Sequence, residues 1–314
     1  MTSAAPLPVD FAEELSQEDV ARRVGVQLNI RPSQVLRTIE LLDDKNTIPF
    51  IARYRKEVTG SLDEVQIQAI EDAAASLRAL HERKGDVLRL INEQGKLTPD
   101  LAQAIAAATT LQAVEDLYLP YRQKRKTRAS VARDKGLGPL AEMILAQAQV
   151  PGLTGQAALD AAAAPYIDPD KGLPTSAEVY AGARDICAEV IAEHATVRGA
   201  VRRLFFAEGQ LRTRLTVSAD ELAEKDPKGT YQLYYDFSEP VARLVPHRTL
   251  AINRAEREDV IRVAVEVPVE RALPLMYATF PVHGASPFAG ELAAAAADGY
   301  KRLLAPAIER EVRA

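Results

Sequence analysis

The segment from Leu62 to Asn92 most constrains the fold, because its apolar residues repeat with the period of a long α-helix. Apolar positions that recur every three or four residues share one stripe of a helix, and the charged positions fall largely elsewhere. We therefore expect one long helix, or a nearly continuous helical hairpin, that packs this stripe against neighbouring helices. The stripe consists of Ile67, Ile70, Ala73, Ala74, Leu77 and Leu80.

Helical patterns with clear start signals fill most of the remaining chain. Two short patterns, from Val9 to Val24 and from Pro32 onward, predict a helix-turn-helix-like pair. Gly95 followed by Thr98-Pro99-Asp100 predicts the end of one helix and the capped start of the next. A second long helix is expected from Thr175 to about Phe206, opened by a capping box. The fold class is therefore mostly α.

The chain changes character after Gly209, where short β-favouring pieces appear. The clearest strand runs from Val260 to Val267, because its valine and isoleucine side chains alternate with Arg262 and Glu266. A last helix begins near Ser286 and reaches the final residue without a capping signal, so we expect the chain to be part of a longer protein. These patterns predict four segments: helix-turn-helix-like 1–60, long-helix 61–210, small mixed α/β 211–285, and a linking helix 286–314.

Positive charge is concentrated in the segment 121–135, although the whole chain has a net charge of −5. A helix that ends at Leu119-Pro120 is expected to lead into an exposed basic loop here, because proline disfavours helical geometry in the residue before it. Such a loop suits phosphate oxygens or an acidic protein surface. Its seven cations are Arg122, Lys124, Arg125, Lys126, Arg128, Arg133 and Lys135, and a second, smaller group comprises Arg53, Arg55 and Lys56.

Three interpretations of these cations are open. They could bind nucleic acid without reading bases, dock on an acidic protein, or form ion pairs inside the domain. The structural interpretation of residues 46–57 is a solvated helical face beside a buried phenylalanine and isoleucine. The helix from Pro32 offers Ser33, Gln34 and Arg37 to DNA but ends in the acidic pair Asp43-Asp44, so we expect it not to read bases.

Signals of catalysis are weak. The four histidines are far apart, the single Cys187 suits a buried free thiol, and no dinucleotide, P-loop or nucleophile-elbow sequence occurs. We predict no enzyme activity, no cofactor, no metal site and no small-molecule substrate. His247 and Arg248 are expected to be structural, with Asp236 or Glu239 nearby and with Leu250 and Ile252 directed into the core.

The location of the protein is predicted from what its sequence lacks. The amino terminus has no signal-peptide pattern, and no uncharged apolar stretch reaches membrane length. We therefore predict a cytoplasmic protein without a membrane partner.

Three long motifs, in this order, resemble the Tex family of bacterial transcription accessory proteins. They are NTIPFIARYRKEVTGSLDE (46–64), VEDLYLPYRQKRKTRASVARDKGL (114–137) and DFSEPVARLVPHRTLAINRAERE (236–258). The chain departs from the expected family pattern at Val245-Pro246-His247-Arg248 and at Arg254-Ala255. The resemblance covers nearly the whole chain from about Phe11 and corresponds to the helical amino-terminal part of such proteins.

The resemblance implies a role in transcription, with RNA or DNA and RNA polymerase or its complex as partners. Family members continue into a ribonuclease-H-like YqgF domain, helix-hairpin-helix repeats and an OB-fold RNA-binding domain. The alternative that it leaves open is a protein-docking helical scaffold that positions those domains.

Overall fold

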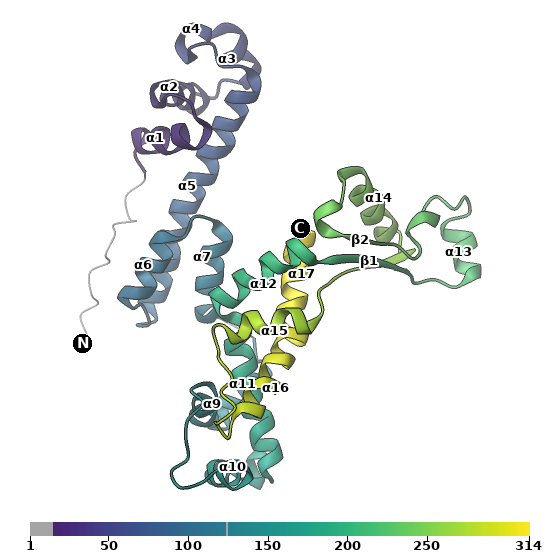
Figure 1. Ribbon diagram of the computed structural model, residues 1–314. Coiled ribbons are helices and arrows are strands. Elements are labelled where there is room, and N and C mark those ends of the chain that lie inside the picture. The colour runs from purple at the N-terminus through teal and green to yellow at the C-terminus, as the bar shows by residue number, and fades with distance from the viewer. Residues whose placement is uncertain (1–14, 124) are drawn as a thin grey trace. The chain divides into compact units, whose positions relative to one another are not determined.

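The computed structural model describes residues 15–123 and 125–314 and confirms a mostly α-helical fold with one small sheet (Figure 1). The chain forms two compact units, of which the first ends at Tyr121 and the second begins at Arg122. This boundary falls inside the predicted segment 61–210. Among the described helices, none combines the length and apolar character needed to cross a bilayer.

The first unit is built along one helix, α5 Glu64–Glu93, whose 30 residues give a length of about 45 Å. Its start is fixed by a capping box, because the Asp63 carboxylate accepts a bond from the Gln66 amide at 2.8 Å and the Gln66 side chain accepts one from the Asp63 amide at 3.1 Å. Ile67 and Ile70 are completely buried. The predicted apolar stripe is therefore confirmed, and it lies on one uninterrupted helix.

Two separate hydrophobic clusters lie along α5. Gly95 adopts a left-handed φ of +67° and Thr98 caps the next helix, both as predicted. The predicted first helix begins only at residue 17, and the part before residue 15 lies outside the described residues. The first cluster joins α5 to α1 Gln17–Leu28, α2 Pro32–Asp43, α3 Ile48–Tyr54 and α4 Lys56–Thr59, and the second joins it to α6 Pro99–Ala107, α7 Leu111–Tyr118 and the 3₁₀ turn η1 Leu119–Tyr121.

The second unit is organised around the helix pair α11 Ser176–Glu193 and α16 Ala289–Gly299. The predicted long helix from Thr175 to Phe206 is wrong in two respects. His194 has an extended backbone and divides it into α11 and α12 Ala195–Glu208. The Thr175 hydroxyl accepts a bond from the Ala177 amide at 3.2 Å rather than from the Glu178 amide that the predicted capping box requires. The other helices are α8 Arg128–Asp134, α9 Gly138–Leu145, α10 Gly155–Ala163, α13 Ala219–Lys225, α14 Pro246–Arg257, α15 Val269–Tyr277, the π-helical turn η6 Tyr300–Leu304 and α17 Ala305–Arg313; 3₁₀ turns occupy Ala164–Tyr166, Pro169–Lys171, Gln232–Tyr234 and Val241–Arg243.

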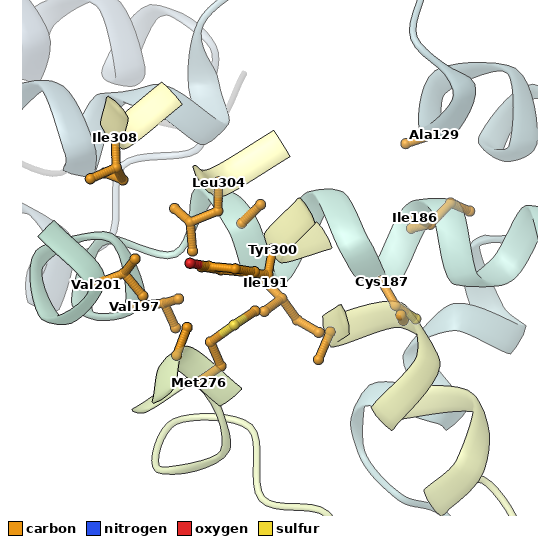
Figure 2. Close-up of a cluster of buried hydrophobic side chains, with 14 of the residues drawn as sticks. Ala129, Ile186, Cys187, Ile191, Val197, Val201, Met276, Tyr300, Leu304 and Ile308 are labelled. Carbon is orange, nitrogen blue, oxygen red and sulfur yellow. The ribbon is translucent and has the colours of Figure 1, made fainter. Parts of the chain in front are cut away.

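The core of this unit requires a close approach between α11 and α16. A Cβ added to Gly299 would lie 2.9 Å from the carbonyl oxygen of Ala188, so only glycine fits there without movement of a backbone. Figure 2 shows the buried side chains around Ile191 and Met276, with Tyr300 among them. The Tyr300 hydroxyl donates to the Val267 carbonyl at 2.6 Å, and burial raises the pKa of Tyr300 to about 12.

Cys187 is a buried free thiol, as predicted (Figure 2). Its Sγ donates a weak bond to the Ala141 carbonyl at 3.5 Å, and burial raises its pKa to about 12. The thiolate form is therefore suppressed at neutral pH, which makes this side chain a packing residue rather than a nucleophile.

The sheet contains three antiparallel strands in the order β2-β1-β3. These are β1 Gln210–Leu215, β2 Ser238–Pro240 and β3 Ile261–Glu266. As predicted, β3 buries Ile261, Val263 and Val265 and exposes Arg262 and Glu266.

Side chains cover the outer edge of β3. The amide of Val263 donates to the Glu256 carboxylate at 3.3 Å, and that of Val265 donates to the Glu309 carboxylate at 3.0 Å. Arg313 donates to the Val263 carbonyl at 3.3 Å and is ion-paired with Glu256. The Val263 amide, the Val263 carbonyl and the Val265 amide are thus satisfied by side chains of α14 and α17.

The predicted pairing of Arg248 is confirmed, whereas the predicted burial of Leu250 is wrong. Arg248 forms an ion pair with Glu239, and its guanidinium lies 5.5 Å from the centre of the Phe237 ring. Ile252 is buried, but Leu250 is 71% exposed. Two residues of separation place side chains on opposite sides of a helix, so α14 cannot bury both.

His194 makes stability depend on pH. Its Nδ1 is buried and has no hydrogen-bond partner among the described residues. Its ring lies edge-on to that of Phe280, with 5.3 Å between the ring centres, and burial lowers its pKa. The folded protein therefore binds this proton less readily than the unfolded chain. The neutral ring's contribution to stability is complete above the unfolded pKa of about 6.5 and is lost as pH falls toward the lower folded pKa.

We accordingly expect His194→Gln to reduce the loss of melting temperature between about pH 8 and about pH 5.5, measured by circular dichroism. The matched control is His247→Gln, which removes an exposed imidazole from α14. A pH dependence that is equal in the two variants would contradict this expectation.

Candidate functional site

The basic segment is not a simple loop. Leu119 keeps helical angles, φ −50° and ψ −43°, in spite of Pro120, and the predicted loop is wrong over Arg128–Asp134, which forms α8. The Thr127 hydroxyl accepts a bond from the Ser130 amide at 3.0 Å, and the Ser130 hydroxyl accepts one from the Thr127 amide at 2.9 Å. This reciprocal cap starts the helix. Two buried alanines of α8, Ala129 and Ala132, then fasten it to the core.

A buried carboxylate on α11 holds α8 in place. Glu189 accepts a hydrogen bond from the Thr127 hydroxyl at 3.0 Å and forms an ion pair with Arg133, in which the nitrogen and oxygen are 2.8 Å apart. Arg133 was predicted to bind nucleic acid, but its guanidinium is engaged within the unit. Lys135 is half-buried, with its Nζ 3.5 Å from the Gly172 carbonyl oxygen. Of the three interpretations of the cations, the ion pair inside the domain thus applies to Arg133.

Apart from Arg133 and Lys135, the described cations of the segment are exposed to solvent. Within the described residues, four of them are exposed and form no ion pair. Lys124 lies outside the described residues. Because charged side chains that stabilise a fold are normally paired, these four are the stronger candidates for an external anion. They are Arg122, Arg125, Lys126 and Arg128.

The smaller cluster lies on α3 and α4 in the first unit. Arg53, Arg55 and Lys56 are exposed, and none forms an ion pair with any carboxylate that the structure describes. The predicted burial of the phenylalanine is wrong, because Phe50 is 36% exposed, and Tyr54 is 58% exposed. The exposed side of α3 is therefore both aromatic and basic.

The turn after α4 is held by α2. The Gln34 side chain donates to the carbonyls of Thr59 at 2.9 Å and Gly60 at 3.2 Å. Gly60 has a φ of +69°, and a Cβ there would meet the Gln34 amide nitrogen at 2.5 Å, so glycine is required. Arg37 is paired with Glu40 at 2.9 Å. Two polar side chains considered for base contacts are thus occupied within the unit.

No metal centre can be assembled from the described parts of the chain, where no three histidine, cysteine, aspartate or glutamate side chains gather. The cavity beside β3 has a volume of about 590 Å³ and is mainly apolar; Tyr300, Val267 and Phe205 are among its lining residues. Two carboxylates line it: Glu309 accepts a hydrogen bond from the Val265 amide, and Glu266 forms an ion pair with Arg212 at 3.8 Å. The exposed cations are therefore the chemically distinctive feature.

Comparison with known proteins covers both units. Residues 18–92 match the family described as Tex-like protein N-terminal domain, and residues 155–298 match Tex central region-like. The chain is 42% identical to Bacillus subtilis YdcI over 95% of this chain, 38% identical to the transcriptional accessory protein Tex of Neisseria gonorrhoeae over 79%, and 31% identical to human S1 RNA-binding domain-containing protein 1 over 79%.

The chain spans only part of each of these relatives: 40% of YdcI, 31% of the gonococcal protein and 24% of the human protein. The α3–α4 cluster lies inside the first matched range, whereas the basic segment lies between the two ranges. Two successive regions of one family are matched in order, and they include α1 to α5 in the first unit and α10 to α16 in the second. The chain therefore belongs to the Tex family.

Proposed function

We propose that the chain is a non-catalytic, cytoplasmic module of a transcription accessory protein that binds RNA or DNA through phosphate oxygens, without reading sequence. The observation that carries the proposal is the set of four exposed cations in the basic segment, which form no ion pair within the described chain. RNA polymerase or its complex is the proposed protein partner. The names of the gonococcal and human relatives, which refer to transcription and RNA binding, support this assignment.

The geometry favours phosphate contacts over base contacts. Guanidinium and ammonium groups meet phosphate oxygens in any sequence, whereas base reading needs polar side chains held toward a groove. Two of the three α2 side chains suited to that task, Gln34 and Arg37, are bonded within their own unit. That α2 does not read bases remains a prediction, and selection from random duplexes should return no consensus sequence.

Salt dependence tests the proposed function directly. If four phosphates are contacted, counterion release gives a slope near −0.9 for each on duplex DNA and near −0.7 for each on a single strand, so binding should weaken roughly fifty- to a hundred-and-fiftyfold between about 50 and 200 mM salt. The measurement is fluorescence anisotropy with labelled RNA and DNA oligonucleotides of two unrelated sequences, which should bind equally well. If the intact chain binds no oligonucleotide at the lowest salt, the proposal fails and the protein-docking scaffold becomes the better account.

A further inference from the structure

Two aromatic rings share one exposed face of α3. Phe50 and Tyr54 are one helical turn apart, and their ring centres are separated by 5.4 Å with an interplanar angle of 43°. Val58 on α4 is 38% exposed as well. Aromatic side chains gain stability from burial, so a pair left 36% and 58% exposed on a helix that is packed on its other side offers a surface to a flat or apolar ligand.

The charge around the rings is predominantly positive. The Arg55 guanidinium carbon lies 5.2 Å from the centre of the Phe50 ring, in the range of a cation–π contact. Arg53 and Lys56 extend from the same two helices, and Glu57 is the exposed acid among them. Ring faces bordered by cations that pair with no described carboxylate complement a ligand that carries both planar apolar groups and negative charge.

The surface is held in a fixed shape before any ligand arrives. Ile51 and Ala52 bury the opposite side of α3 in the cluster that includes α5. Gln34 holds the end of α4 through the Thr59 and Gly60 carbonyls, and the Thr59 side chain is buried. A rigid surface loses little conformational entropy on binding, which favours affinity.

We propose that α3 and α4 form a stacking platform for unpaired bases, so that the ligand class at this surface is single-stranded nucleic acid. A duplex hides its base faces within the stack, whereas a single strand can place one or two bases on the Phe50 and Tyr54 rings. Its phosphates then lie near Arg53 and Lys56. The inference rests on the proposed function and adds to it a preference for single strands over duplexes.

The test compares labelled single-stranded RNA of about 20 nucleotides with a duplex of equal length at fixed salt, using the whole chain. Tyr54→Ala should weaken single-strand binding about tenfold, Tyr54→Phe should preserve it, and neither should change duplex binding. The matched control is Phe206→Ala, which removes a 49% exposed ring of α12 and should have no effect. Photocross-linking of 5-iodouridine RNA should label the peptide that carries Tyr54.

The outcomes separate the two proposals. If the unmodified chain binds neither oligonucleotide, the proposed function itself fails. If it binds both with salt dependence but Tyr54→Ala changes nothing, or weakens both equally, the stacking platform is refuted while phosphate binding stands. Cross-linking that is absent from the α3 peptide would refute the platform as well and would favour a protein-docking role for this face.

Discussion

Replacing Arg122, Arg125, Lys126 and Arg128 together with alanine is expected to weaken oligonucleotide binding roughly a hundredfold at about 50 mM salt and to remove most of its salt dependence. The physical reason is that these four cationic side chains are exposed and form no ion pair with described residues, so their charge is available to phosphate groups. The fold should persist, because Ala129 anchors α8 in the core and Glu189 holds Thr127.

A matched control variant tests whether the affinity depends on the position of these cations or only on the net charge of the chain. The chain offers four other exposed cations in the second unit that form no ion pair with described residues. Their replacement by alanine removes the same total charge and should lower affinity only slightly. Anisotropy and circular dichroism on both variants complete the measurement, and salt-sensitive binding retained by the first variant would place the contact elsewhere. The control positions are Arg214, Lys228, Arg243 and Arg257.

Gly299→Ala should lower the free energy of unfolding by about 2 kcal/mol, although alanine is the better helix former. The new Cβ would lie 2.9 Å from the Ala188 carbonyl oxygen and 3.2 Å from the Ala188 Cα, so the contact is with backbone rather than with a flexible side chain. The helices α11 and α16 must then move apart and loosen the packing around Tyr300. Scanning calorimetry should show a melting temperature lower by about 5 °C.

The same helix provides the control. Gly290 lies in the first turn of α16, and a Cβ there would meet nothing within 4 Å. Gly290→Ala should therefore leave stability unchanged or raise it by up to about 1 kcal/mol. Similar melting temperatures for the two variants would show that the close approach at Ala188 carries no stability.

Patterns within one helix were predictable, because they depend on neighbours in sequence. The stripe containing Ile67 and Ile70 predicts α5, and the sequence around Thr98 predicts the start of α6. The alternation in β3 is local in the same way. Each of these features follows from periodicity or capping that is complete within a short segment.

Features that depend on distant residues were not predictable in this way. The concentration of cations in 121–135 is visible in the sequence, but Glu189, which holds Arg133, is 56 residues further along the chain. The exposure of Phe50 has the same origin, because the adjacent Ile51 and Ala52 occupy the buried side of α3. A local signal does exist: Phe50 and Tyr54 are four residues apart, which places them on one face of α3.

The covered edge of β3 limits the pairing of strands between copies of this chain. An open strand edge can recruit a strand from another molecule and begin a growing intermolecular sheet. Here such a strand would first have to displace the Glu256 and Glu309 carboxylates from the Val263 and Val265 amides, and Arg313 from the Val263 carbonyl. The side chains of α14 and α17 thus act as a barrier to aggregation at the most β-prone segment of the protein.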